Sequence, residues 1–597
     1  IVVEVLFFIL TATIAYYGWG QIERLQEYPQ HTTALRIPFL IPYLILPFGF
    51  GLMCFRLLQS LYKQVKVCGL VDTLIGLIAV FVIASPVIFC DYIEPLPALF
   101  GYFIVLCAIG VPVAISLGLS TLATIICADT LPIEYMAQVA FTSIDSFPIM
   151  AIPFFIAAGV FMGAGGLSHR LLSLADEIVG GTYGGIGLTA IVTCMFFGAI
   201  SGSGPATVAA LGAVLIPAMV EQGGFSAPFS TALMATSSSI AIVIPPSIAF
   251  VVYASITGVS IADMFMAGIV PGLLMGVALV IIVMIEAKKH NIQPSREKAS
   301  AKERWNTFKD AFWGFLMPVI ILGGIYGGIF TPTEAAAVSV VYGLFVGMVI
   351  YREVKLKDLF DILVDSAKTT GGIMLIVASA SLFSFVCTKF GIANAASELL
   401  AGIAHNQFTF LLIVNIIFLI AGCFIDANSA MYIFVPIMLP VCKALGYDVV
   451  AFGVMATVNL AIGQVTPPVG VNLFVAISIK IKKGLEVTLQ QISRAVMPMI
   501  AASVAVLLII TYIPAVSTAL PKALAKEGSY TGDQSSDTES QSSKDSGDGS
   551  DSFNTIADYS DLDWPEMTWN FACSTTETST WADGGRKFGE LMEKATG

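Results

Sequence analysis

Two polar segments interrupt long apolar stretches of this chain, and they hold the residues best suited to bind a solute. The first runs from Gly198 to Pro205 and is followed about 40 residues later by Ile244-Pro-Pro-Ser247. The second runs from Gly422 to Ser429 and is followed at a similar distance by Val465-Thr-Pro-Pro468. A bilayer core offers no water to freed backbone groups, so such breaks persist only where they face protein, a ligand or a wet cavity.

Each break exposes helix ends, which bind ions without using full charges. Free N–H groups at a helix N-terminus suit a carboxylate, whereas free carbonyls with hydroxyl and amide oxygens suit a hard cation such as Na⁺. Proline adds to this effect, because it lacks an N–H and leaves a carbonyl one turn earlier unpaired. The pattern therefore predicts Na⁺ sites beside a site for a small carboxylate, with no other metal and no catalytic residue.

The predicted Na⁺ ligands form one cluster at each break, and two or more ions are expected. They are Ser201, Gly202, Ser203, Gly204, Ser238 and Ser239 in the first cluster, and Asp426, Ala427, Asn428, Gly463 and Thr466 in the second. Ser237 and Gln464 belong to the same clusters. The predicted substrate ligands are Ser203, Pro205, Pro246, Asn428, Ser429, Pro468 and Asn472. Ser and Asn also cap helices, so a purely structural role stays open for each of them, and Asn472 fits packing as well as substrate contact.

Other polar residues favour structural roles. Glu334 lies in Thr331-Pro-Thr-Glu334, which has the spacing of a capping box with proline at the first helical position. Arg56 interrupts an apolar helix and is better explained by snorkelling or packing than by substrate binding. His169 and His405 lie near the predicted arms and indicate no metal, and the ten cysteines form no Cys-x-x-Cys motif. No Walker loop occurs, so ATP hydrolysis, a nucleotide cofactor and enzyme activity are not predicted.

Composition places the chain in a membrane, and its internal spacing indicates a repeat. Hydrophobic residues make up 57% and charged residues 12% of the sequence, with a mean hydropathy of +0.87. Gly166 lies 37 residues before Ser203, and Gly391 lies 37 residues before Asn428. Two corresponding breaks in two halves are typical of the substrate site of a secondary transporter.

The apolar runs predict an all-α polytopic membrane protein with two re-entrant hairpins and two broken helices. Helices at 3–19, 39–61 and 70–89 precede the repeat. The first half continues with helices at 97–110, 112–127 and 148–165, an arm at 167–177, a hairpin at 184–220, a broken helix at 229–256 and a closing helix at 266–286. The second half has helices at 313–329, 333–350 and 370–390, an arm near 392–403, a hairpin at 409–443, a broken helix at 449–478 and a closing helix at 495–515. Spanning needs about 20 residues, and the hairpin arms are shorter, so both hairpins should re-enter.

Charge predicts the orientation, because Lys and Arg collect in cytoplasmic loops. Basic residues cluster at 288–309, 352–368 and 480–494, whereas the loops 91–97, 128–147 and 257–265 carry acids without Lys or Arg. Counting crossings from the basic segment 62–69 puts the basic clusters inside and the C-terminus outside. The same count makes the hairpins enter from opposite sides, so the repeats are predicted to be inverted.

The two ends of the chain differ from its middle. The chain begins at Ile1 inside an apolar run without Met or a signal sequence, and we expect the true N-terminus to be missing. After Pro521 the sequence becomes rich in Ser, Asp and Gly, which predicts a disordered tether. Met567–Cys573 then favours a strand and Trp581–Lys594 an amphipathic helix, so a further domain is expected to begin here and to be cut off.

Four segments together resemble the large membrane subunit of tripartite ATP-independent periplasmic (TRAP) transporters over residues 95–518. They are Ser201-Gly-Ser-Gly-Pro-Ala-Thr-Val-Ala-Ala210, Ile244-Pro-Pro-Ser-Ile248, Phe330-Thr-Pro-Thr-Glu-Ala-Ala-Ala337 and Thr466-Pro-Pro-Val-Gly-Val-Asn472. Residues 1–65 resemble the end of the small membrane subunit, and residues 565–597 resemble the start of the substrate-binding protein. On this division 66–94 is a connecting helix, 95–290 and 313–518 are the two repeats around a cytoplasmic loop at 291–312, and 519–564 is an acidic linker.

The resemblance implies an elevator mechanism in the bacterial inner membrane, with Na⁺ symport, uptake of organic acids and delivery of substrate by an extracytoplasmic binding domain. In this hypothesis the hairpins and broken helices move against a scaffold of arms, outer helices and small subunit, embedded in the lipid bilayer. No nucleic-acid partner is indicated. The alternative is an ion or organic-anion permease of the same inverted-repeat architecture that works without a binding protein. Deleting residues 519 onward from the full-length protein separates the two, because only the first hypothesis requires the tail.

Overall fold

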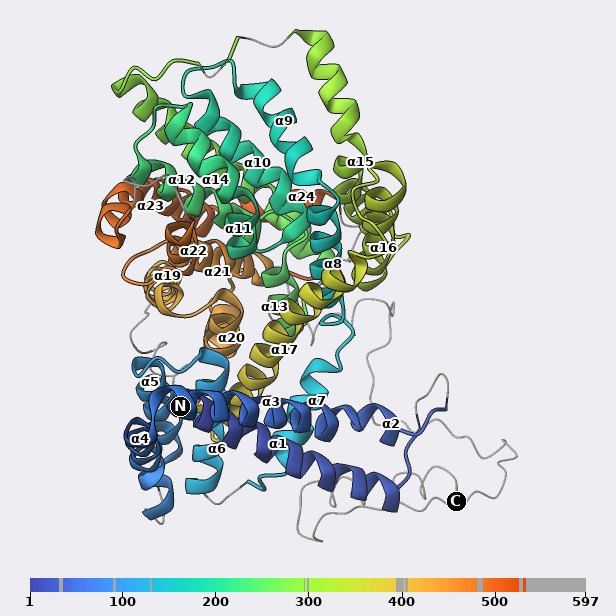
Figure 1. Ribbon diagram of the computed structural model, residues 1–597, viewed down its shortest axis with the longest axis vertical. Coiled ribbons are helices and arrows are strands. Elements are labelled where there is room, and N and C mark those ends of the chain that lie inside the picture. Colours follow the sequence, from blue (N-terminus) through green and yellow to red (C-terminus); the bar gives the residue numbers. More distant parts are fainter. Residues whose placement is uncertain are drawn as a thin grey trace, which may run out of the picture. The chain divides into compact units, whose positions relative to one another are not determined.

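The protein is described here by a computed structural model, and its described part is helical. The described residues are 1–31, 36–89, 93–128, 131–294, 296–297, 300–392, 402, 406–479, 487–524 and 530–532. The chain divides into two units, Ile1–Ser535 and Ser536–Gly597, and all described residues lie in the first. Within these ranges 11 helices are long and apolar enough to cross a membrane by length and composition, or up to 12 if one bent pair counts as a single span. The predicted all-α polytopic fold is confirmed (Figure 1).

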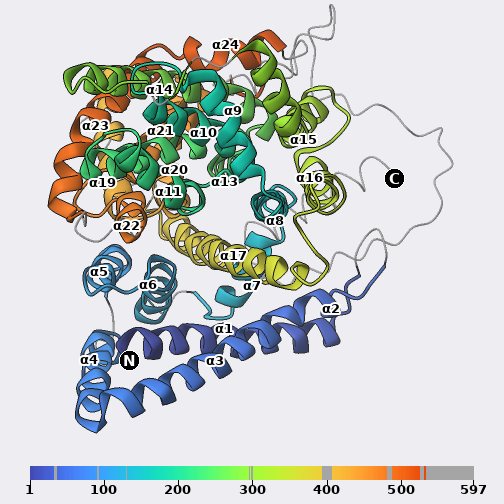
Figure 2. The same cartoon turned by 45° about the horizontal axis from the view of Figure 1, so that its top comes forward.

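Four N-terminal helices of the described residues precede the repeat, and the first and third of them form a pair. The elements are α1 (Val2–Glu27), α2 (Leu40–Tyr43), α3 (Ile45–Cys68) and α4 (Leu70–Phe89). Figures 1 and 2 show α1 and α3 side by side. Polar contacts between them include Gln64 Nε2 donating to Glu4 Oε1 at 2.8 Å and Cys54 Sγ donating to Thr11 Oγ1 at 3.2 Å. Arg56 is exposed, and its side chain donates to Gln59 Oε1 of the same helix at 3.1 Å.

The first half follows the predicted order with one additional helix. Its elements are α5 (Pro95–Ala108), α6 (Val113–Ala128), α7 (Tyr135–Ile144), α8 (Ala151–Ala164), the arm α9 (Leu167–Val179), the hairpin α10 (Gly185–Ser201) and α11 (Gly204–Glu221), the broken helix α12 (Ala227–Ser239), η1 (Ile240–Ile242) and α13 (Ile248–Thr257), and the closing helix α14 (Ile261–Lys289). The additional helix, α7, lies in the predicted acidic loop 128–147. It forms because Met136, Ala137 and Ala140 bury one face against neighbouring helices.

The second half repeats this order. It consists of α15 (Ala301–Tyr326), α16 (Pro332–Phe345) with the π-helical turn η2 (Val346–Ile350), α17 (Leu359–Lys389), the hairpin α19 (Gln407–Phe424) and α20 (Ala427–Ala444), the broken helix α21 (Val449–Gly463) and α22 (Val471–Ser478), and α23 (Leu489–Tyr512), followed by α24 (Ala515–Leu524). α15 begins 12 residues before the predicted start because Ser300 and Glu303 form a capping box, so the loop predicted at 291–312 is largely helix. The capping box predicted at Thr331 and Glu334 is confirmed, with Glu334 Oε2 accepting from the Thr331 N–H at 2.8 Å.

Each half has an equivalent close backbone contact between its own hairpin and its own broken helix. In the first, a Cβ on Gly198 would lie 2.7 Å from Ala241 Cα. In the second, a Cβ on Gly422 would lie 3.0 Å from Gly463 Cα. Both glycines precede their hairpin tips by four residues, and Ala241 and Gly463 each precede the Pro-Pro pair by four. The predicted repeat is therefore also a repeat of close backbone packing.

Helix packing separates the hairpins from a second group of helices. The arms α10, α11, α19 and α20 pack with the broken helices, and the broken helices pack with α14 and α23. We call these helices together the hairpin group. The long helix α17 packs against α6, α7 and α8 and also reaches α20, as Figure 2 shows. Three of the four hairpin arms have 18 residues and pass the length test for spanning. Length alone therefore does not establish that the hairpins re-enter, because re-entrance depends on where the hairpin tips lie.

Several predicted features fall outside the described residues. These are most of the arm near 392–403, His405, the basic residues at 480–483, most of the acidic linker and the segment 565–597. The linker predicted from residue 519 begins differently, because α24 continues to Leu524.

Candidate solute site at the hairpin tips

The tips of the two hairpins line a single cavity of about 160 Å³. The first tip contributes Gly202, Ser203, Gly204 and Pro205, and the second contributes Asp426, Ala427 and Asn428. The remaining wall consists of Ile242, Ile248 and Ala249 from the first broken helix, Gln464 from the second, and Ile373 and Ile376 from α17. A cavity of about 150 Å³ holds a molecule of the size of benzene, so this one has room for a small organic solute.

The first tip presents a helix N-terminus that no side chain caps. Gly202 has the left-handed conformation, with φ of 60°, and Ser203 is the extended N-cap residue of α11. A Cβ on Gly202 would lie 2.8 Å from the carbonyl oxygen of Pro246, so only glycine lets the tip approach the broken helix this closely. Ser203 and Gly204 line the cavity, and no side-chain hydrogen bond caps α11. The partial positive charge of this helix end is therefore available to an anion.

The second tip carries its own carboxylate. Asp426 is the N-cap residue of α20, and its Oδ2 accepts from the N–H groups of Asn428 and Ser429 at 3.1 Å each. The hydroxyl of Ser429 also donates to this carboxylate. These bonds satisfy the helix N-terminus internally and place a negative charge there, which disfavours an anion and favours a cation.

Unpaired oxygens surround the second tip. Asn428 Oδ1 and Gln464 Oε1 are buried without a hydrogen-bond partner among the described residues, and both residues line the cavity. A buried acceptor without a partner costs about 1–3 kcal/mol. Two such oxygens beside a carboxylate form a donor set that suits a hard cation such as Na⁺, because hard cations prefer oxygen ligands.

Asn472 lies where the two halves meet, behind the cavity wall. It is fully buried, and its Nδ2 donates to Ser238 Oγ at 3.3 Å. A Cβ on Gly204 would lie 2.8 Å from the same Nδ2. Asn472 of the second half therefore packs between the broken helix α12 and the hairpin tip of the first half. This position favours the packing role that the sequence left open. Its Oδ1 and the hydroxyl of Ser237 are buried without partners among the described residues, so oxygen ligands remain here as well.

The structure brings eight residues of the predicted clusters into the cavity wall: Gly202, Ser203, Gly204, Pro205, Asp426, Ala427, Asn428 and Gln464. The others lie beside it or turn away. Ser201 and Ser429 hydrogen-bond to tip residues, Pro246 lies against Gly202, and Gly463 packs on Gly422. Ser238, Ser239 and Thr466 donate to carbonyls of their own helices, and Pro468 is exposed. Which of these residues bind Na⁺ and which bind substrate stays a prediction.

The apolar part of the cavity wall was not predicted from the sequence. Ile373 and Ile376 come from α17, which belongs to the second group of helices, so the cavity lies between the two groups. An isoleucine inside an apolar helix carries no signal that distinguishes a cavity wall from ordinary packing.

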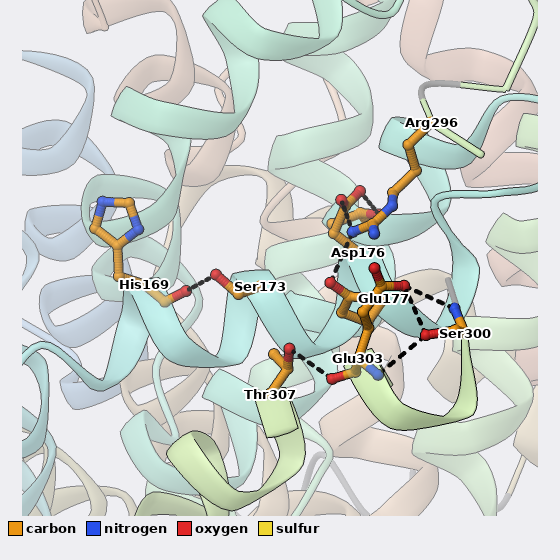
Figure 3. Close-up of polar contacts among 9 residues, drawn as sticks. His169, Ser173, Asp176, Glu177, Arg296, Ser300, Glu303 and Thr307 are labelled. Atoms are coloured by element: carbon orange, nitrogen blue, oxygen red, sulfur yellow. Dashed lines mark hydrogen bonds and ion pairs between the residues drawn. The ribbon is translucent and has the colours of Figure 1, made fainter. Parts of the chain in front are cut away.

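A separate polar cluster fastens the arm α9, as Figure 3 shows. Arg296 Nη1 lies 2.9 Å from Glu177 Oε1 and 3.2 Å from Asp176 Oδ2. The hydrogen bond that Arg296 donates to Glu177, together with the one to Asp176, raises the pKa of Arg296. Asp176 Oδ1 also accepts from Thr189 Oγ1 of α10 at 3.3 Å. These bonds join the arm to the first hairpin and to the loop after α14.

Comparison with known families decides the class of protein. The model of the tripartite ATP-independent periplasmic transporter DctM component matches residues 100–516, and that of the DctQ component matches residues 1–67. The chain belongs to the TRAP transporter permease family. The predicted joining of small and large membrane components in one chain is confirmed.

Relatives of this TRAP permease are named either as a permease protein DctMQ or as a large permease protein DctM. The isethionate TRAP transporter permease protein DctMQ of Oleidesulfovibrio alaskensis is 49% identical over 516 residues, which cover 86% of this chain and 80% of that protein. The C4-dicarboxylate TRAP transporter large permease protein DctM of Rhodobacter capsulatus is 41% identical over 440 residues, covering 71% and 98%. Among solved structures, the YdaH transporter of Alcanivorax borkumensis is similar, with a TM-score of 0.48, 16% identity and coverage of 66% and 90%.

These findings make the chain a transport protein and not an enzyme. They leave the far C-terminal region open, because neither family model extends beyond residue 516. The fused binding domain and the outside location of the C-terminus therefore stay predictions.

Proposed function

We propose that this TRAP permease imports a small organic acid together with Na⁺ by an elevator-type movement. The observation that carries the proposal is the asymmetry of the cavity. Its first tip offers an uncapped helix N-terminus, and its second tip offers a carboxylate with two unpaired oxygens. One cavity thus has a surface for an anion beside a surface for a cation.

The proposed substrate class follows from charge and size. No Lys, Arg or His occurs among the described residues of the cavity wall, so the anion would be held by helix N–H groups and hydroxyls. A volume of about 160 Å³ suits a small carboxylate. Two relatives are named for isethionate and for C4-dicarboxylates, which are small organic acids.

Na⁺ would act at the second tip before or with the substrate. Coordination by Asn428 and Gln464 would satisfy both buried oxygens and offset the charge of Asp426, which lowers the cost of placing an anion in the same cavity. Coupling then arises because each ion improves the site of the other. The hairpin group would carry the loaded cavity along the apolar surface of Ile373 and Ile376 on α17.

The family works with a substrate-binding protein, which disfavours the alternative of a permease that needs none. In the proposal, substrate reaches the cavity from such a protein or from a domain attached to the C-terminus.

The test is uptake into proteoliposomes, with the binding protein supplied and a labelled small carboxylate or isethionate as solute. Uptake should require a Na⁺ gradient. Asn428→Ala should raise the Na⁺ concentration for half-maximal uptake by about tenfold or more, the scale of losing one bond to a charged partner. Ser203→Ala should raise the substrate concentration for half-maximal uptake by a similar factor, because its hydroxyl faces the anion in this proposal. Ser478→Ala is the matched control, because its hydroxyl donates to Val475 O on an exposed face outside the cavity. Full uptake with K⁺ in place of Na⁺ on both sides would refute the coupling.

A further inference from the structure

The described residues closest to the C-terminus, Tyr530–Gly532, bind to the first residues of two helices, and none of these first residues lines the cavity. Ser260 is the N-cap residue of α14 and Asp448 is the N-cap residue of α21. The segment lies beyond residue 516, where the family match ends. Its contacts therefore concern a part of the chain that the permease family does not explain.

Thr531 provides the hydrogen bonds to a buried carboxylate. Asp263 is only 5% exposed, and its Oδ2 accepts from the N–H of Thr531 at 3.0 Å and from its hydroxyl at 2.6 Å. The N–H of Ser260 in turn donates to Thr531 Oγ1 at 3.0 Å. A carboxylate at this depth is costly unless it is hydrogen-bonded, and among the described residues Thr531 alone donates to it.

The second anchor is Asp448, whose side chain is 10% exposed. Its carboxylate caps α21 through the Ala451 N–H, accepts from the Tyr530 hydroxyl at 2.9 Å, and pairs with Lys522 of α24 at 3.3 Å. The Val449 N–H donates to the carbonyl oxygen of Gly532 at 3.1 Å.

The geometry of this anchor requires glycine at its end. A Cβ on Gly532 would lie 2.5 Å from the Tyr530 hydroxyl oxygen and 2.6 Å from Asp448 Oδ1. Since Asp448 is held by α21 and α24, an added side chain would displace the segment. Each residue of the segment therefore has its own role. Tyr530 donates its hydroxyl to Asp448, Thr531 donates its N–H and hydroxyl to Asp263, and Gly532 leaves room for both neighbours.

Both anchors belong to the hairpin group. α14 and α21 pack with each other and with the hairpins, and α24 packs against α14, α21 and α23. We propose that Tyr530–Gly532 is a clip that docks the C-terminal extension onto the hairpin group, so that whatever follows Gly532 is carried by this group and not by the scaffold. The docking itself stands on the contacts above, and only the statement that the group moves rests on the proposed function.

The docking is tested by amide hydrogen exchange on the full chain in detergent without Na⁺ or substrate. Asp263→Ala should speed exchange of the Thr531 N–H by about tenfold to a hundredfold, the range for losing a hydrogen bond to a charged group. Gly532→Ala should have the same effect through the clash, which keeps the test decisive if the first variant does not fold. The controls are Asp361→Ala, an exposed acid of α17, and Gly371→Ala, whose Cβ would meet nothing within 4 Å. Unchanged exchange in both test variants would overturn the clip.

Carriage by the hairpin group is tested by locking the clip. Ser260→Cys with Thr531→Cys places two thiols on residues that are in direct contact, since the backbone N–H of Ser260 lies 3.0 Å from Thr531 Oγ1. Uptake should be equal before and after disulfide formation in the same protein, because the clip moves with the group. Loss of uptake on oxidation, with recovery on reduction and no loss in either single variant, would show that the clip must open and would overturn the proposal. Failure of the proposed function would instead abolish uptake in the reduced protein as well.

Discussion

Replacing Gln464 by Met should stabilise the sodium-free protein and weaken its response to Na⁺. Gln464 is 5% exposed, and its Oε1 has no partner among the described residues. Met has nearly the same length and volume, so it removes the unpaired acceptor without leaving a cavity. The backbone role survives, because it is the carbonyl oxygen of residue 464 that accepts from the Asn472 N–H at 3.1 Å.

The two effects have opposite signs. An unsatisfied buried acceptor costs about 1–3 kcal/mol, so its removal should stabilise the empty protein by about 1 kcal/mol. Na⁺ at 100 times its Kd stabilises the native state by about 2.7 kcal/mol. If the loss of one ligand weakens binding about tenfold, the same Na⁺ concentration gives only about 1.4 kcal/mol. The variant should therefore melt above the wild type without Na⁺ and lose about half of the Na⁺-dependent increase.

The assay is thermal unfolding in detergent over a series of NaCl concentrations, with choline chloride holding the ionic strength constant. Gln138→Met is the control, since Gln138 is exposed on α7 and does not line the cavity. A Gln464→Met variant that melts below the wild type without Na⁺, or that keeps the full Na⁺-dependent increase, would refute the assignment of this oxygen.

Three further predictions concern packing, the arm and the C-terminus. Gly463→Ala places a Cβ 2.6 Å from Gly422 Cα, so the second hairpin must shift, and thermal unfolding should show a loss of about 1–3 kcal/mol together with lost uptake; wild-type stability would contradict it. Arg296→Ala should destabilise by no more than about 1 kcal/mol, because the group is 31% exposed, yet limited proteolysis of the loop after α14 should accelerate; an unchanged digestion rate would contradict it. A Cys at Ser543 should react with a membrane-impermeant maleimide in intact cells, and labelling only after lysis would exclude an outside C-terminus.

The sequence predicted the tips because polar residues are conspicuous in an apolar segment. The Ser-Gly-Ser-Gly-Pro run and the Asp-Ala-Asn-Ser run both lie in the cavity wall or beside it, and the spacing between hairpin and broken helix reappears as the Gly198 and Gly422 contacts. Local rules were equally successful where a motif is self-contained, as in the capping box at Thr331.

What the sequence could not predict depends on which partner a residue meets. Asp426 looked like a Na⁺ ligand, yet its carboxylate accepts two N–H groups of its own helix, and nothing in the run distinguishes these roles. The sequence left Asn472 open between substrate contact and packing, and only the fold shows it between Ser238 and Gly204. The start of α17 at Leu359 was missed because Asp361, Asp365 and Lys368 interrupt the apolar residues of its first turns, and helix propensity with packing outweighs hydropathy there.

The two hairpins are alike in backbone packing and their tips differ in chemistry, and both properties fit the coupled carrier that we propose. A movement that exposes one cavity to either side is easiest when both halves have the same packing, and the matched contacts of Gly198 with Ala241 and Gly422 with Gly463 provide it. Coupling two ions of opposite charge requires the reverse, because two identical tips would attract the same ion. Here one helix N-terminus is left uncapped and the other is capped by Asp426, so a single side chain reverses the electrostatic preference of one tip. A repeat that keeps its glycines while its tips diverge therefore fits the proposed combination of alternating access with coupling.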